Sequence, residues 1–154
     1  MSIIILMETK QALEIALRDA MRSKNEIVLR TIRLVMSSVK MSEIEKGKPI
    51  DEPGVIAILQ KEIKSRKESI ADAEKAGRAD LMALSNAEIA ILEGYLPKQM
   101  PEDELLEMVK EAILESQAKS PNDMGKVMKI LMPKIQGRVA GDVLSLTVRK
   151  LLGS

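Results

Sequence analysis

The chain has 154 residues, with 24 Lys and Arg against 23 Asp and Glu, so its formal net charge is +1. It contains no Cys and no His, which excludes disulfides, thiolate or imidazole metal sites and His-dependent catalysis. Tyr95 is the only aromatic residue, whereas 45% of the residues are hydrophobic and 11 are Met. Aliphatic and thioether side chains in these proportions are typical of helical bundles, and we therefore predict an all-α fold.

Helical periodicity predicts four helices in the first part of the chain, over residues 8–21, 26–45, 53–76 and 79–96. The second of them carries an apolar face made of Leu29, Ile32, Met36 and Val39. Glycine or proline follows each of the last three predicted helices, at Gly47, Pro49, Gly77 and Pro97. These breaks predict an N-terminal four-helix domain over residues 1–97.

The third and fourth predicted helices carry matching apolar stripes. If one stripe is reflected about Gly77, it falls on the other, as in an antiparallel helical hairpin. The apolar pairs that this reflection predicts are Leu59 with Tyr95, Ile63 with Ile91, Ile70 with Leu84, and Ala73 with Leu81. The same reflection places Arg66 opposite Glu88, each within an apolar stripe. We therefore predict that these two residues form a structural ion pair across the hairpin.

The rest of the chain, residues 98–154, predicts a small basic three-helix tail domain. A helix over 101–116 starts with an acidic turn, which the helix dipole favours. Ser120, Pro121 and Asp123 resemble a capping box at the start of a short helix that ends near Met132, before Pro133. A glycine-containing loop precedes a last helix over 142–152.

Charge is unevenly distributed along the chain. Residues 119–154 contain seven basic and two acidic residues, whereas residues 1–118 carry a net charge of −4. This asymmetry suggests phosphate binding by the tail. The candidate RNA-binding residues are Lys126, Lys129, Lys134, Gly137, Arg138 and Lys150. A solvated basic surface is the alternative interpretation. Because the tail has no aromatic residue, an RNA would be held by its backbone and shape rather than by base stacking.

Other candidate sites have simpler structural explanations. The acidic residues of 102–107 suit the first turn of a helix better than a metal site. Ser65 and Ser69 lie near Lys64 and Lys67, but nothing beside them marks an oxyanion hole. The methionines of 124–132 indicate core packing or an adaptable partner groove. We predict no catalytic residue, no metal and no cofactor.

The segment Ile3–Met7 is the longest apolar run and is too short for a membrane span or a signal-peptide core. Met7 is a candidate alternative start. A cytoplasmic location without a membrane partner is the expectation from these features.

Several motifs of the chain resemble those of the GatB/YqeY family. They are Arg66-Lys67-Glu68-Ser69-Ile70, Glu74-Lys75-Ala76-Gly77-Arg78-Ala79-Asp80-Leu81, Glu88, Tyr95-Leu96-Pro97-Lys98-Gln99-Met100, Asp123-Met124-Gly125-Lys126-Val127-Met128, Met132-Pro133-Lys134 and Gly137-Arg138. Two departures are Ala73, where members often carry an aromatic residue, and Val139-Ala140, which replaces a small residue followed by an acid. The second departure removes an expected helix N-cap.

The resemblance implies a four-helix domain followed by a three-helix tail. It also implies kinship with the C-terminal region of the B subunit of tRNA-dependent amidotransferase, a carbon–nitrogen ligase that uses glutamine as amido donor. In that enzyme the region helps to hold the tRNA and is not the catalytic core. Carried over to this chain, Lys126, Lys134, Gly137 and Arg138 become candidates for contact with the tRNA backbone.

The leading hypothesis is therefore a non-catalytic accessory protein that binds tRNA or another structured RNA. One alternative is participation in glutamine-dependent amidotransferase chemistry, although neither a glutaminase nucleophile nor an ATP site is recognisable in the sequence. The other alternative is a protein-interaction module. Expected partners are a structured RNA and components of an amidotransferase or a tRNA synthetase.

Overall fold

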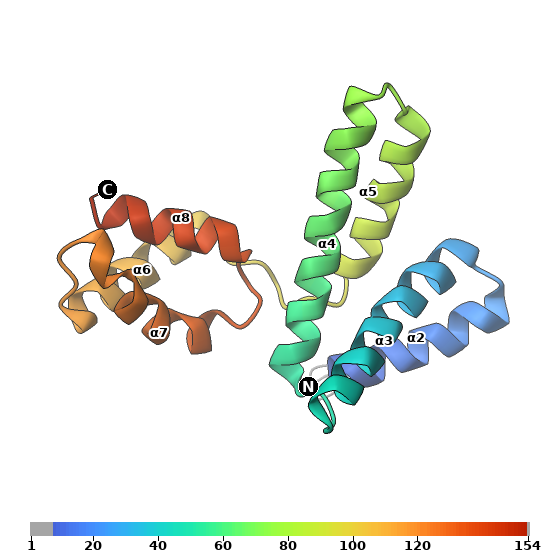
Figure 1. Cartoon of the computed structure of the whole chain (residues 1–154), viewed down its shortest axis with the longest axis horizontal. Coiled ribbons are helices and arrows are strands. Elements are labelled where there is room, and N and C mark those ends of the chain that lie inside the picture. The colour runs from blue at the N-terminus through green and yellow to red at the C-terminus, as the bar shows by residue number, and fades with distance from the viewer. Residues whose placement is uncertain (1–7, 154) are drawn as a thin grey trace. The chain divides into compact units, whose positions relative to one another are not determined.

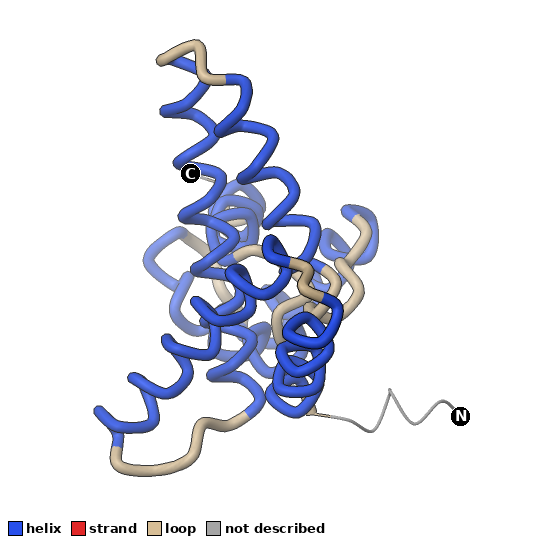
Figure 2. Tube along the Cα trace, turned by 90° about the vertical axis from the view of Figure 1, so that its right-hand side faces the viewer, coloured by secondary structure: helices blue, strands red, loops and turns tan. Residues whose placement is uncertain are grey.

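A computed structural model describes residues 8–153, so the apolar run Ile3–Met7 lies outside the described residues. Every regular element in this range is helical, and Figure 2 shows no strand among the described residues, which confirms the all-α prediction. The helices are α2 (Thr9–Ser23), α3 (Glu26–Lys46), α4 (Glu52–Lys75), α5 (Ala79–Glu93), α6 (Glu102–Ser116), α7 (Met124–Ile135) and α8 (Gly141–Leu151), with a 3₁₀ turn, η1 (Pro121–Asp123), before α7.

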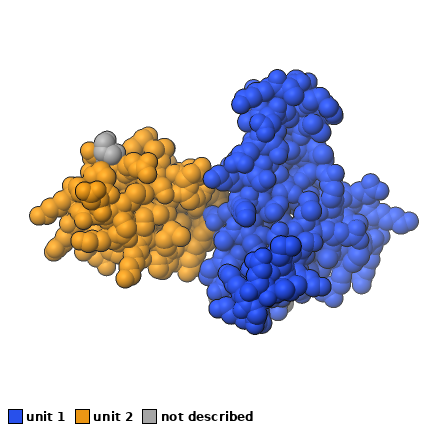
Figure 3. Space-filling view, viewed as in Figure 1, with its two compact units in different colours: residues 1–96 blue, residues 97–154 orange. Residues whose placement is uncertain are grey.

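The chain divides into two compact units, Met1–Leu96 and Pro97–Ser154, which are coloured separately in Figure 3. Helices α2 to α5 lie in unit 1 and α6 to α8 in unit 2. Each unit has a hydrophobic core of its own. That the two units are domains able to fold separately, divided at residues 97 and 98, stays a prediction.

The core of unit 1 is built from aliphatic side chains of all four of its helices. Leu13, Ile32, Leu59 and Leu92, one from each helix, are fully buried. The tightest local arrangement is the antiparallel hairpin of α4 and α5, which run side by side in Figures 1 and 2. Gly77 makes the turn with a φ of +67°, a conformation that costs glycine little. The Arg78 N–H donates to the Ala73 carbonyl at 2.9 Å and closes the end of α4.

The end of α5 differs from the prediction. The helix stops at Glu93 rather than at residue 96, and the N–H groups of Tyr95 and Leu96 instead donate to carbonyls three residues earlier. Pro97 disfavours the α conformation at Leu96, and Gly94, a poor helix former, directly follows the last helical residue.

The core of unit 2 contains two fully buried side chains from α7, Val127 and Leu131. Helix α7 does not end at Met132 as predicted, since it passes through Pro133 to Ile135. Pro133 lacks a backbone N–H and so removes one helical hydrogen bond, in the last turn of α7. Burial of Ile135, which is 3% exposed, offsets that loss.

The predicted capping at the start of α7 is formed differently. Ser120 makes no side-chain capping hydrogen bond. The Asp123 carboxylate instead accepts the Lys119 N–H at 2.9 Å. At α8 the N-cap residue is Ala140, which has no side chain able to cap.

Candidate nucleic-acid interface

The predicted RNA-binding lysines of α7 lie at its surface. Val127, Leu131 and Ile135 anchor the helix in the core of unit 2, and their spacing turns Lys126 and Lys129 toward solvent on the opposite side. Lys126 is 70% exposed, and its ammonium is 3.7 Å from the Asp123 carboxylate. Lys129 is exposed and has no ion-pair partner among residues 8–153.

Two further lysines share this exposure. Lys134 is 52% exposed, and its Nζ lies 3.9 Å from an oxygen of Glu115 on α6. Lys150 is exposed near the end of α8, without an ion-pair partner in the described range. Ion pairs as long and as exposed as those of Lys126 and Lys134 contribute at most about 1 kcal/mol, so a phosphate can displace them.

Arg138 is held differently, because its guanidinium is already bound within unit 2. Its Nε donates to the Lys98 carbonyl at 3.1 Å, and its two terminal nitrogens donate to the Glu104 carboxylate at 3.1 and 3.3 Å. The backbone carbonyl of Arg138 also accepts the Met100 N–H at 2.9 Å. Arg138 therefore fastens the segment before α6 to the loop after α7.

Gly137 takes part in the same set of contacts between the segment before α6 and the loop after α7, which we call the Arg138 clamp. Its carbonyl accepts a hydrogen bond from the Gln99 side chain at 3.2 Å, and its φ is +84°. The conformation permitted by this glycine turns the chain after α7, where Gln136 is also left-handed, with a φ of 40°. The structure thus separates the predicted set into exposed lysines and a structural pair, Gly137 and Arg138.

The whole of unit 2 is not basic, contrary to the predicted basic tail domain. It contains nine basic and eight acidic residues, because α6 alone carries six of the acids. Within unit 2 the excess of positive charge is concentrated in residues 117–154, which carry seven basic and two acidic residues. The pKa of Asp123, one of the two acids in that part, is lowered chiefly because its carboxylate accepts the Lys119 backbone N–H.

In unit 1 the structure brings Arg66 and Glu88 together across the α4–α5 hairpin. Arg66 Nε donates to Glu88 Oε2 at 2.7 Å, and both residues are buried. Burial lowers the pKa of Arg66, but hydrogen bonds to Glu62 and Glu88 outweigh it, so its pKa is raised. Arg30 of α3 is a partner that the sequence did not predict, with its Nη2 2.5 Å from Glu88 Oε1.

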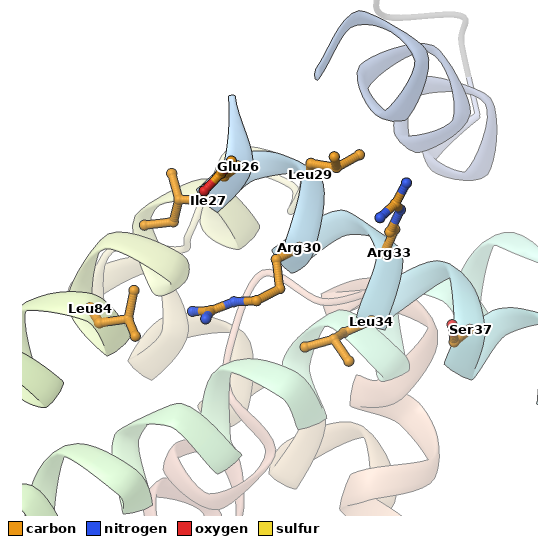
Figure 4. Close-up of a pocket in the computed structure, with 8 residues that line it drawn as sticks. All are labelled: Glu26, Ile27, Leu29, Arg30, Arg33, Leu34, Ser37 and Leu84. Atoms are coloured by element: carbon orange, nitrogen blue, oxygen red, sulfur yellow. The ribbon is translucent and has the colours of Figure 1, made fainter. Parts of the chain in front are cut away.

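A surface hollow of about 670 Å³ lies beside Arg30 (Figure 4). Its lining comes almost entirely from α3, with Leu84 contributed by α5. Of the apolar face predicted for α3, only Leu29 lines this hollow. The sequence signal for the outward side of the helix is the recurrence of Ile27 and Leu34 seven residues apart.

The sequence of the chain matches a known family over nearly its full length. The family described as Yqey-like protein matches residues 10–152. The chain belongs to the YqeY-like family. The motifs around the α4–α5 hairpin and at the start of α7, on which the resemblance to GatB/YqeY proteins rests, lie within the matched range.

Several fungal proteins are similar to this YqeY-like chain. "Altered inheritance of mitochondria protein 41, mitochondrial" from Pyrenophora tritici-repentis is 33% identical over 146 residues, covering 92% of this chain and 80% of the relative. The protein of the same name from Kluyveromyces lactis is 41% identical over 85 residues, covering 54% and 46%. That from Saccharomyces cerevisiae (strain YJM789) is 36% identical over 86 residues, covering 55% and 46%. The chain thus spans less than half the length of the last two.

These names contradict the cytoplasmic location expected from the sequence, because each of these relatives is named as mitochondrial. The expectation rested only on the lack of a recognisable targeting segment, which does not locate a protein. None of the helices in residues 8–153 is long and apolar enough to span a membrane.

Proposed function

We propose that this YqeY-like protein binds tRNA or another structured RNA as a non-catalytic accessory protein. The contact is made by the basic face of α7, defined as Lys126, Lys129 and Lys134, with Lys150 of α8 as a further cation. The observation that carries the proposal is that these four ammonium groups are exposed and at most weakly paired within the described part of the chain.

The spacing of the basic face suits a charged backbone. Lys126 and Lys129 are neighbours on a helix surface, with Cβ atoms about 5–6 Å apart. Lys134 lies eight residues beyond Lys126, which is about 12 Å along the axis. Each phosphate that one of these lysines neutralises releases counterions, so binding weakens as salt rises.

The charge distribution within unit 2 supports a preferred orientation of the RNA. Helix α6 carries six acids and one base, whereas residues 117–154 carry seven bases and two acids. An RNA approaching α6 is repelled, and one approaching the basic face is attracted. Unit 2 has no aromatic residue, so contacts to backbone and shape replace base stacking.

The proposal assigns no bond-making chemistry to this chain. The titratable network of Arg66, Glu88, Glu62 and Arg30 is internally paired and serves packing. A role in glutamine-dependent amidation, which the resemblance to the amidotransferase B subunit implies, is proposed only as assistance to a partner that holds the catalytic groups.

A charge-reversal experiment tests the basic face. Binding of total deacylated tRNA is measured by mobility shift for the wild-type chain and for the Lys126→Glu/Lys129→Glu variant. We expect the variant to bind at least about tenfold more weakly at low salt, because two attractive contacts become repulsive.

The matched control is Lys64→Glu/Lys67→Glu on α4. These two lysines are also three residues apart, exposed and without an ion-pair partner among the described residues. An equal loss in both variants indicates a general effect of net charge and contradicts the assignment to α7. Full affinity in the α7 variant contradicts it as well.

A further inference from the structure

The chain passes from unit 1 to unit 2 within a few residues around Pro97. On the unit 1 side, Tyr95 and Leu96 pack against the core of unit 1. Their N–H groups donate to the carbonyls of Leu92 and Glu93, at 3.1 and 3.2 Å. The chain is therefore anchored to unit 1 as far as Leu96.

On the unit 2 side, the Arg138 clamp anchors the first residues of that unit. The Lys98 carbonyl accepts a hydrogen bond from Arg138 Nε at 3.1 Å, and the Met100 N–H donates to the Arg138 carbonyl at 2.9 Å. The side chain of Gln99 donates to the Gly137 carbonyl at 3.2 Å. Met100 also packs against the core of unit 2. The chain is therefore anchored to unit 2 from Lys98 onward.

Pro97 is the residue between the two anchored stretches, and it makes a stiff joint. Its ring fixes its own φ at about −65°. It also restricts the preceding residue, Leu96, to extended backbone conformations. The peptide bond that follows is planar, so rotation at the joint is limited chiefly to ψ of Pro97 and φ of Lys98.

The clamp that keeps the joint this short lies at the surface of unit 2. Its ion pair joins Arg138 to Glu104 at 3.1 Å, and the two side chains are 31% and 44% exposed. Surface contacts of this kind can break locally while the hydrophobic core stays folded. Once the bonds to Lys98 and Gln99 are broken, the joint comprises residues 97–99 instead of one residue. The two additional residues add at most about 7 Å to its reach.

From these contacts we infer that the Arg138 clamp is a conformational device that sets the length of the joint between the two units. With the clamp closed, the joint is Pro97 alone. With the clamp open, the joint is residues 97–99, and unit 2 moves over a wider range relative to unit 1. This role is separate from the proposed RNA contact of α7, which uses other side chains.

Backbone order parameters from ¹⁵N relaxation of the full chain test whether the clamp is closed. In the wild-type chain, the amides of Lys98 and Gln99 should have order parameters of about 0.85, the value of rigid backbone on the ps–ns timescale. The Gln99→Ala/Arg138→Gln variant removes both side-chain bonds of the clamp to this segment. In that variant the order parameters of residues 98 and 99 should fall to about 0.6 or below. Val109, in the core of unit 2, should keep its value.

Spin labels test whether the clamp controls the range of motion between the units. Because the chain has no Cys, the substitutions Lys64→Cys and Val143→Cys place one label on α4 and one on α8 without background labelling. Both positions are exposed. Double electron–electron resonance then gives the distribution of distances between the labels. Adding Gln99→Ala/Arg138→Gln should broaden this distribution by several ångströms, up to the additional reach of about 7 Å.

The matched control is Arg78→Gln, which makes the same substitution in another exposed ion pair. Arg78 Nη2 lies 2.9 Å from the Asp80 carboxylate, at the turn between α4 and α5. This variant should leave the order parameters of residues 98 and 99, and the width of the distance distribution, as they are in the wild-type chain.

Three results would overturn the inference. The first is an order parameter of about 0.6 or below at Lys98 and Gln99 of the wild-type chain, which would show that the clamp is open in solution. The second is a Gln99→Ala/Arg138→Gln variant in which either the order parameters or the distance distribution are unchanged. The third is an equal fall in the order parameter of Val109, which would show that the variant loosens all of unit 2 rather than the joint.

Discussion

The buried ion pair between Arg66 and Glu88 gives a prediction whose size follows from the structure. Replacing Glu88 by Leu removes two hydrogen bonds to guanidinium groups, at 2.7 Å from Arg66 and 2.5 Å from Arg30. Removing one partner of a fully buried pair costs about 3–5 kcal/mol. Arg66 keeps a second carboxylate, Glu62, at 2.7 Å, and Arg30 is half exposed. We therefore expect a loss of about 2–3 kcal/mol, at or below the lower end of that range.

The double variant Arg66→Met/Glu88→Leu should lose much less than the sum of its two single variants. With both charged groups gone, no buried charge is left without a partner, and apolar side chains fill the space between α4 and α5. The coupling energy from the double-mutant cycle should be about 2 kcal/mol in favour of the native pair.

The single aromatic residue makes the assay specific for unit 1. Tyr95 packs against the core of unit 1, so its fluorescence follows the unfolding of that unit, whereas far-UV circular dichroism follows both units. With a urea m-value of about 1–1.5 kcal/mol/M, the loss in Glu88→Leu lowers the unfolding midpoint by about 2 M. Additive single variants, or a loss below about 1 kcal/mol in Glu88→Leu, would refute the reasoning.

Three further predictions concern stability. Arg138→Gln should destabilise unit 2 by about 1 kcal/mol in urea unfolding followed by circular dichroism, since it breaks the clamp to Glu104; an unchanged transition would argue against the clamp. Ala140→Asp should stabilise α8 by about 1 kcal/mol, because it supplies the missing N-cap, and a lower midpoint would show that no cap forms. The pKa of Glu43 is lowered by hydrogen bonds to the Ile50 N–H and to Lys10. The Glu43 carboxylate therefore stabilises the fold at pH values above 4.5, the ordinary pKa of a glutamate, and this stabilisation is lost as the pH falls through the lowered pKa. The Glu43→Gln variant should show a smaller loss of stability in acid titrations.

The sequence predicts the α4–α5 hairpin well because its determinants are local. Gly77 marks the turn, and residues equidistant from it carry matching side chains, so the contact between Arg66 and Glu88 follows from position alone. Helix limits depend on finer effects. Pro133 is tolerated because it falls in a last turn that Ile135 anchors, and no local pattern reveals that anchoring.

Contacts between distant segments could not be predicted from the sequence. Arg30 joins the hairpin network from 58 residues away, through the packing of α3 on α5. Arg138 reaches Glu104, 34 residues earlier, only because the loop after α7 lies beside the start of α6. The sequence shows the charge of both arginines but not the partner that each one finds in the fold. Arg138 was therefore predicted to contact RNA, whereas in the structure it binds Glu104 within unit 2.

The salt dependence of tRNA binding tests the central claim most directly. If Lys126, Lys129, Lys134 and Lys150 each neutralise one phosphate, the logarithm of the association constant should fall with the logarithm of the salt concentration with a slope of about −3 to −4. The Lys126→Glu/Lys129→Glu variant should flatten that slope by about two. Absence of tRNA binding at low salt, or a slope that this variant leaves unchanged, would contradict RNA binding through the basic face of α7.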